Sequence, residues 1–126
     1  MQHVVPASQA TKIHYPGIEV SAYDCGDDFA SASTILVAGS HDRIRSTASD
    51  RIYLVMQGSG WFEVDGAIRP VAVEDVIFLP RETVYAYGGE MRLFLVHAPG
   101  FQAGTDQRMS GQAAEAEGVP STSDLT

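Results

Sequence analysis

The side chains best suited to chemistry in this sequence are an arginine and two tyrosines, Arg51, Tyr53 and Tyr85, together with Glu82. An arginine can hold a carboxylate, a phosphate or an enolate through two parallel hydrogen bonds. A tyrosine hydroxyl can donate a proton or stabilise an oxyanion, and a glutamate whose pKa is raised by burial can act as a general base. We therefore take Tyr53, Tyr85 and Glu82 as candidate catalytic residues and Arg51 as a substrate-binding residue. The structural alternatives are an internal ion pair between Arg51 and Glu82, tyrosines with satisfied hydroxyls, and a solvated glutamate.

Three further residues are candidate substrate contacts: Arg45, Tyr87 and His97. Arg45 lies in a short basic segment that is either a solvated loop or a lid that recruits an acidic ligand. His97, near the end of the last apolar run, suits core packing as well as a pocket role. We expect His41 to be a solvated loop residue, although His41, His97 and Glu82 together offer the ligand types of an unusual metal site.

Short runs rich in β-branched and aromatic residues must position these side chains. The clearest run, Arg51–Gln57, is followed by Gly58-Ser59-Gly60, which we interpret as a tight turn, and Asp65-Gly66 is a strong hairpin signal. About eight such runs with evenly spaced turns predict an all-β sandwich or small barrel. The runs are Ile18–Tyr23, Ser33–Val37, Arg51–Gln57, Trp61–Val64, Ala67–Val73, Val76–Leu79, Thr83–Tyr87 and Met91–His97.

Alternation along Arg51–Gln57 separates two faces with different compositions. The face that begins with Arg51 and Tyr53 suits a barrel lumen with a polar mouth. The opposite face is wholly apolar, so a second sheet or a partner subunit must cover it, and with Ile18–Tyr23 it predicts a homodimer. The first face comprises Arg51, Tyr53, Val55 and Gln57, and the second comprises Ile52, Leu54 and Met56.

Residues 33–101 resemble the cupin family, whose first motif is G-x5-H-x-H-x3–4-E-x6-G and whose second is G-x5-P-x-G-x2-H-x3-N. Gly58 matches the last glycine of the first motif and Pro80 matches the proline of the second. Val64-Asp65-Gly66 and Phe78-Leu79-Pro80 also resemble the family's hairpin and strand end. The resemblance implies an all-β fold, the cupin-type double-stranded β-helix or jelly-roll barrel, over residues 1–101.

The metal ligands of the family are absent from the matching positions. The carboxylate position falls at Arg51 and one histidine position falls at Tyr85. The other two histidine positions fall at Ile44 and Ser46, or one residue later with the shorter spacing. A cationic side chain in place of the carboxylate would repel a divalent ion, so we expect no metal and no other cofactor. The same charge inversion suits an anionic ligand or a developing oxyanion.

Three functions remain open on the sequence. The first is a metal-independent enzyme that acts on a small organic metabolite, anionic or carbonyl-containing, by proton transfer. Isomerases, cyclases and lyases related to cupins work in this way, which the resemblance implies and the residues do not show. The second is a non-catalytic module that binds a small molecule in the lumen. The third is an atypical metallo-cupin that uses His41, His97 and Glu82.

Composition excludes several other classes. The chain of 126 residues fits one domain, and its net charge of −8 and pI near 4.7 argue against nucleic acid as a partner. No run of about 18 apolar residues suggests a membrane span, and we see no secretory signal near Met1. A single cysteine, Cys25, is compatible with the reducing cytoplasm, which is the location we expect.

The last segment, Gln102–Thr126, changes character. It is rich in small, polar and acidic residues and has few large apolar ones. Such a segment buries too little surface to offset its ordering entropy, so we expect a flexible acidic and polar tail after a single barrel domain.

Overall fold

The computed structural model describes residues 1–109 and has one antiparallel sheet that folds over on itself. The strands follow the order β1-β2-β3-β7-β4-β5, with β6 paired to β4 and β8 paired to β3. The expected all-β fold is confirmed. The elements are η1 (Ala7–Gln9), β1 (Thr11–Tyr15), β2 (Ile18–Tyr23), β3 (Ser31–Ser46), β4 (Asp50–Val64), β5 (Ala67–Ala72), β6 (Val76–Leu79), β7 (Val84–Ala98) and β8 (Asp106–Arg108).

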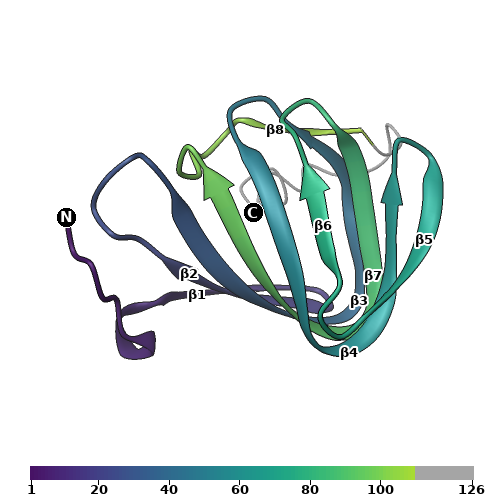
Figure 1. Ribbon diagram of the computed structural model, residues 1–126, viewed down its shortest axis with the longest axis horizontal. Coiled ribbons are helices and arrows are strands. Elements are labelled where there is room, and N and C mark those ends of the chain that lie inside the picture. Colours follow the sequence, from purple (N-terminus) through teal and green to yellow (C-terminus); the bar gives the residue numbers. More distant parts are fainter. Residues whose placement is uncertain (110–126) are drawn as a thin grey trace.

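Three long strands, β3, β4 and β7, each run through both halves of the folded sheet. Figure 1 shows them curving together at the bottom of the molecule, with β1 and β2 at one edge and β5 at the other. The expected turn at Gly58-Ser59-Gly60 is wrong, because β4 continues through it. The glycines instead allow the paired strands β4 and β7 to approach each other closely, since a Cβ on Gly60 would lie 2.2 Å from the Gly88 carbonyl oxygen.

The predicted faces of β4 are confirmed over most of its first half. Arg51, Tyr53 and Val55 are at most 1% exposed and point into the lumen between the two halves, whereas Ile52 is 42% exposed on the outer face. Gln57 is exposed despite its parity. A register shift between Val55 and Gln57 in the pairing of β4 with β7 explains this, because a bulge reverses the alternation.

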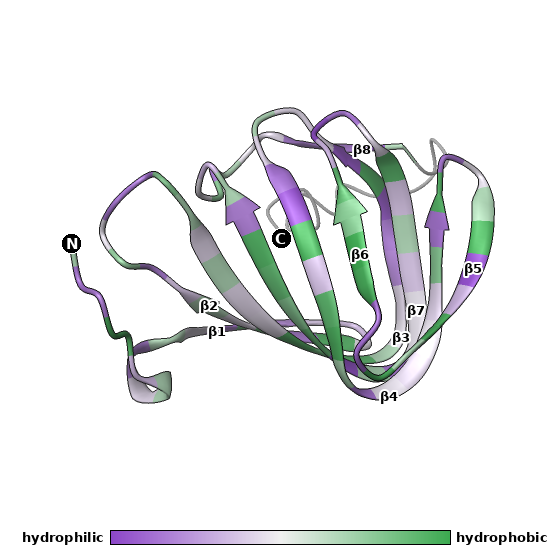
Figure 2. Cartoon of the chain, viewed as in Figure 1, coloured by the Kyte–Doolittle hydropathy of each residue, from purple (hydrophilic) through white to green (hydrophobic). Residues whose placement is uncertain are grey.

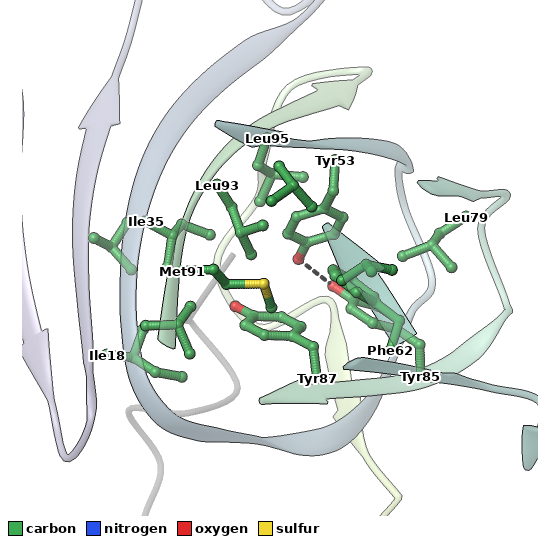
Figure 3. Close-up of a cluster of buried hydrophobic side chains, with 14 of the residues drawn as sticks. Ile18, Ile35, Tyr53, Phe62, Leu79, Tyr85, Tyr87, Met91, Leu93 and Leu95 are labelled. Carbon is green, nitrogen blue, oxygen red and sulfur yellow. Dashed lines mark hydrogen bonds between the residues drawn. The ribbon is translucent and has the colours of Figure 1, made fainter. Parts of the chain in front are cut away.

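The core fills the space between the two halves of the sheet. Figure 3 shows aliphatic side chains of β2, β3 and β7 facing the aromatic rings of β4 and β7 across this space. Figure 2 shows the strongest hydrophobic colouring along β6 and parts of the long strands. The largest core side chains are Ile18, Ile35, Ile44, Tyr53, Phe62, Tyr85, Tyr87, Met91, Leu93 and Leu95.

The expected boundary at residue 102 is wrong for the first part of the predicted tail. Asp106–Arg108 form β8, which pairs with β3 at the open end of the barrel (Figure 1). Asp106 is only 4% exposed, and its burial is compensated by an ion pair with Arg51. The rest of the predicted tail, residues 110–126, lies outside the described residues.

Within residues 1–109 the only helical element is the three-residue turn η1, and no helix is long and apolar enough to cross a membrane.

Candidate functional site

A chain of buried polar side chains crosses the lumen from β4 to β7 and β8. Arg51 Nη1 donates to Tyr85 Oη at 2.6 Å, and the hydroxyls of Tyr85 and Tyr53 share a hydrogen bond of 2.7 Å. Arg51 Nη2 also donates to Asp106 Oδ1 in an ion pair. Figure 3 shows the Tyr53 and Tyr85 hydroxyls meeting near the centre of the barrel. The structure thus brings together Arg51, Tyr53 and Tyr85 as predicted, and adds Asp106.

The hydrogen bonds among these buried side chains keep Arg51 charged, and burial keeps Tyr53 and Tyr85 neutral. Burial alone would lower the pKa of Arg51, but the oxygens of Tyr85, Tyr53 and Asp106 together raise that pKa above its usual value. Burial raises the pKa of Tyr53 well above its usual value and also raises the pKa of Tyr85, against the opposing charge of Arg51. The two phenols are therefore hydrogen-bond donors at neutral pH.

His41 lies inside the lumen, so the expectation of a solvated loop residue is wrong. His41 is only 4% exposed, and its ring stacks on the Tyr87 ring with centroids 4.8 Å apart. A register shift in β3 between His41 and Ile44 changes the alternation on this stretch. The shift lies after His41, which keeps the parity of the buried Ile35 and Val37. Its position was missed because the predicted run ended at Val37, whereas β3 continues to Ser46.

The tautomer of His41 follows from its one hydrogen bond. Nδ1 lies 2.6 Å from the Asp42 carbonyl oxygen, which can only accept, so Nδ1 carries the proton. Nε2 then holds the lone pair, and it has no hydrogen-bond partner among the described residues. Burial, with smaller contributions from the charges of Arg51 and Arg108, lowers the pKa of His41 to about 4, although the bond to Asp42 opposes the shift. His41 is therefore a neutral base at physiological pH.

His97 lies next to Arg51 across the β4–β7 pairing and is 1% exposed. Its Nδ1 is 3.5 Å from Ser31 Oγ, and its ring packs against Phe101 with centroids 5.4 Å apart. Burial and then the charge of Arg51 lower the pKa of His97 to about 3. His97 thus packs in the core, as one interpretation expected, and also lines a cavity, while its predicted contact with a substrate stays a prediction.

That cavity, of about 320 Å³, lies on the inner face of β1, β2 and β3. Its wall is mixed, with hydroxyls, aliphatic side chains and the rings of His97 and Phe101, and three aspartates stand around it. The lining includes Thr11, Ile13, Val20, Ala22, Ser31, Ser33, His97 and Phe101, with Asp24, Asp27 and Asp28.

Two predicted site residues lie outside the lumen. The Glu82 side chain is 57% exposed and pairs with Arg45 at 3.3 Å, while Arg45 also donates to Gln107. Glu82 lies in the turn between β6 and β7, where it has a positive φ of 75°. The exposure of Glu82 agrees with the alternative of a solvated glutamate and lacks the burial that a general base would need. The ion pair considered between Arg51 and Glu82 is wrong, since Asp106 takes that place. Arg45 is part of β3, not of a loop or lid.

The residues in the lumen do not fit the metal that cupins commonly bind. A divalent ion needs imidazole nitrogens and a carboxylate, but Arg51 stands among the lumen residues with its charge already paired. Among residues 1–109 there is no group of three or more histidine, cysteine, aspartate or glutamate side chains that could hold a metal ion. His41, His97 and Glu82 therefore do not form the alternative site that the sequence left open.

Comparison with solved structures identifies the fold as that of the cupins. Pac13 of Streptomyces, described as a nucleoside dehydratase, is 22% identical, with a TM-score of 0.80 over 86% of this chain and 92% of that chain. KdgF from Halomonas sp. is 17% identical, with a TM-score of 0.64 over 73% of this chain and 88% of that one. A variant of salicylate 1,2-dioxygenase from Pseudoaminobacter salicylatoxidans is 17% identical, with a TM-score of 0.60 over 66% of this chain and 26% of that one.

No family model matches the sequence. No curated protein matches it either. The expected jelly-roll fold is thus confirmed by the structural comparison. Sequence identities this low support a shared fold and no more. Pac13 has been solved with uridine in three variants, one with a histidine replaced by glutamine and two with a tyrosine replaced by phenylalanine.

Proposed function

We propose that this protein is a metal-independent enzyme that eliminates water from a small hydroxylated carbonyl compound, with a nucleoside-like molecule as its substrate. The observation that carries the proposal is the neutral imidazole of His41, whose Nε2 lone pair is buried in the lumen without a partner among the described residues. Its ring lies 6.3 Å, between centroids, from that of Tyr85, which is hydrogen-bonded to both Tyr53 and Arg51. A base and an oxyanion donor therefore lie beside each other in the lumen.

The proposed reaction needs one proton acceptor and one group that stabilises negative charge. Nε2 of His41 takes the proton from the carbon next to the carbonyl group, and the electrons left behind form an enolate. One phenol proton of the Tyr53–Tyr85 pair holds the two hydroxyls together. The other proton, on a pair polarised by Arg51, donates a hydrogen bond to the enolate oxygen. The carbon–oxygen bond one carbon further on then breaks, and the departing hydroxyl takes the proton back from His41. The products are an unsaturated carbonyl compound and one water molecule, with His41 returned to its neutral form.

The comparison with Pac13 supports the choice of substrate class. Its two replaced tyrosines stand thirty-four positions apart, which is also the separation of Tyr53 and Tyr87. Its replaced histidine stands thirteen positions before the first of them, and His41 stands twelve before Tyr53. A histidine and two tyrosines are also the residue types that meet in this lumen. We infer that His41, Tyr53 and Tyr87 occupy the equivalent places, with the Tyr87 ring packed against both His41 and Tyr53, and that Tyr85 is an additional tyrosine of this lumen.

The role of Arg51 differs from the one its sequence position suggests. Its charge is already paired with Asp106, so it has little capacity left to bind an anionic ligand. An arginine held in this way polarises Tyr85 through a hydrogen bond instead of contacting substrate directly. We therefore favour an uncharged carbonyl compound over an anionic one.

The test is an assay of the purified protein against nucleosides and their oxidised, carbonyl-bearing derivatives, with mass spectrometry to detect a product lighter by one water. His41→Gln is expected to lower kcat/KM by about 10²- to 10⁴-fold. Tyr53→Phe and Tyr85→Phe are each expected to lower it by about 10²-fold. His14→Gln, which changes a histidine whose side chain is 71% exposed, is the matched control and should leave the rate unchanged.

Full activity of the His41→Gln variant would rule out the proposed base. Binding of nucleosides without any product would favour the alternative, a non-catalytic binding module. The cavity beside His97 is the feature that such a module would use.

We also propose that the protein is a homodimer. The outer face of the half-sheet formed by β6 and the first half of β4 exposes a row of large apolar side chains, in which Ile52 pairs with Phe78. Phe78 is 69% exposed, Val76 46%, Ile52 42% and Met56 41%, and a second copy of this face would cover them. The segment Ile18–Tyr23 has less apolar surface to contribute to the proposed dimer interface than the sequence suggested, because Ile18 and Val20 are buried in the core.

A further inference from the structure

The cavity on the inner face of β1, β2 and β3 is not used by the proton-transfer chemistry described above. Its volume of about 320 Å³ lies at the lower end of the range of roughly 300–1,000 Å³ found for small-molecule sites. This space fits one metabolite-sized group, and Ser31, Ser33 and Thr11 supply hydroxyls to its wall. A purely apolar ligand would leave these hydroxyls without partners.

His97 provides the second observation that a polar ligand belongs here. Its residue is 1% exposed and lines the cavity, yet Nε2 has no hydrogen-bond partner among the described residues. Ser31 Oγ accepts a hydrogen bond from the Phe101 amide at 2.9 Å, which leaves the Ser31 hydroxyl proton to point toward His97 Nδ1. Nε2 then carries the ring proton. A buried donor without an acceptor is costly, so an oxygen of a ligand is its natural partner.

The charge around the cavity limits what that ligand can be. Asp24, Asp27 and Asp28, which we call the acidic rim, are exposed and stand at the cavity, and no lysine or arginine is among its described lining residues. Carboxylates accept hydrogen bonds from hydroxyl groups, as they do from the ribose of bound nucleotides. They repel a phosphate group, which binding sites usually hold with arginine, lysine or amide donors.

We propose that this cavity binds the hydroxylated, uncharged part of the ligand and that the acidic rim excludes phosphorylated forms, so that nucleosides bind and nucleotides do not. The choice of a nucleoside rests on the proposed function. The presence of a site rests on the cavity and on His97, and the selection against phosphate rests on the acidic rim. The rim is part of a fixed wall, since the Gly100 amide donates to the Asp28 carbonyl at 2.9 Å and joins the two loops that flank the cavity.

The test is calorimetric titration of the full chain with uridine and with uridine 5′-monophosphate at low ionic strength. Wild-type protein is expected to bind the monophosphate at least about tenfold more weakly than uridine. In the rim variant, Asp24→Asn with Asp27→Asn and Asp28→Asn, the two affinities should come within about threefold. Asparagine keeps the oxygens that accept from the Gly26 and Phe29 amides, so the loop should remain folded.

A matched control removes three acidic charges elsewhere. Asp65→Asn, Glu74→Gln and Glu90→Gln change exposed residues that do not line the cavity, so the control should keep the wild-type preference for uridine. Ala22→Phe fills the cavity without changing charge and should weaken uridine binding about a hundredfold at an unchanged unfolding midpoint.

Equal wild-type affinities, an unchanged preference in the rim variant, or no uridine binding at all would each overturn the proposal. Uridine binding that Ala22→Phe removes, without water elimination from any nucleoside, would instead remove the proposed reaction and leave this site in place.

Discussion

Arg51 and Asp106 form an ion pair whose side chains are 1% and 0% exposed, and it joins β4 to β8 at the open end of the barrel. The pair neutralises the cation that occupies the cupin carboxylate position. It also fixes the guanidinium so that its other end can hold the Tyr85 hydroxyl. A residue in a segment with no strand signature thus determines the charge of the lumen.

Removing the carboxylate from this pair should destabilise the fold. Asp106→Asn leaves a buried guanidinium without its counter-ion, and breaking such a pair typically costs about 3–5 kcal/mol. Urea unfolding measures the loss. Asp50→Asn, which breaks the exposed pair with Arg81, is the control and should shift the midpoint far less. Equal shifts in the two variants would contradict the buried pair.

Stability should fall in mildly acidic solution because two buried histidines resist protonation. Burial lowers the pKa of His41 to about 4 and that of His97 to about 3, against about 6.5 in the unfolded chain. Above pH 6.5 both states are neutral and stability is complete. As the pH falls from about 6.5 toward 4, the unfolded chain binds protons that the folded protein does not, so stability is lost by up to about 1.4 kcal/mol per pH unit for each histidine.

Urea unfolding at about pH 7.5, 6 and 5 checks this dependence. His41→Gln and His97→Gln should each flatten the slope, because each variant removes one ring that the folded protein keeps neutral. A wild-type midpoint that stays constant over this range would show that the two rings are not held neutral.

The close approach of the paired strands β4 and β7 should make Gly60 irreplaceable. A Cβ at Gly60 would lie 2.2 Å from the Gly88 carbonyl oxygen and 2.9 Å from Met91 Cε, so Gly60→Ala forces the strands apart at a cost of about 1–3 kcal/mol or more. Gly100→Ala is the matched control, because its nearest neighbours would lie at 3.5 Å. Thermal unfolding compares the two variants, and a similar unfolding midpoint for both would be inconsistent with the close approach of β4 and β7 at Gly60.

The homodimer can be tested by light scattering at micromolar concentration. Wild-type protein should have the mass of two chains, and Phe78→Asp should have the mass of one, because it places a charge in the proposed interface. Ile68→Asp changes an equally exposed residue, at 65%, on β5 and should remain dimeric. A monomeric wild type would defeat the proposal, and dissociation of the Ile68→Asp variant alone would move the interface to the other half of the sheet.

Much of the fold could be predicted from the sequence, because strand alternation carries strong physical information. The bounds of β2 and β6 match the predicted runs, and Arg51, Tyr53 and Val55 face the lumen as alternation requires. The prediction of a turn at Gly58 and Gly60 was wrong, since a glycine that permits the close approach of two strands cannot be told in sequence from a glycine that makes a turn.

The site was predictable only where it lies on regular strands. Tyr53, Tyr85 and Tyr87 were found because they follow the alternation of predicted strands. His41 was missed because the predicted run ended at Val37, although β3 continues through it with the same alternation. Asp106 was missed because its burial depends on a partner 55 positions away, which no local pattern reveals. The candidate catalytic role of Glu82 depended on burial, which the sequence could not decide, and the side chain is exposed beside Arg45.

The central claim is that His41 is a neutral base with its lone pair on Nε2, and nitrogen-15 NMR of the histidine rings tests it most directly. We predict that the His41 ring keeps its proton on Nδ1 between about pH 5 and pH 8 and titrates only near pH 4. A ring that carries its proton on Nε2, or that titrates near the ordinary histidine pKa of about 6.5, would contradict the proposed chemistry.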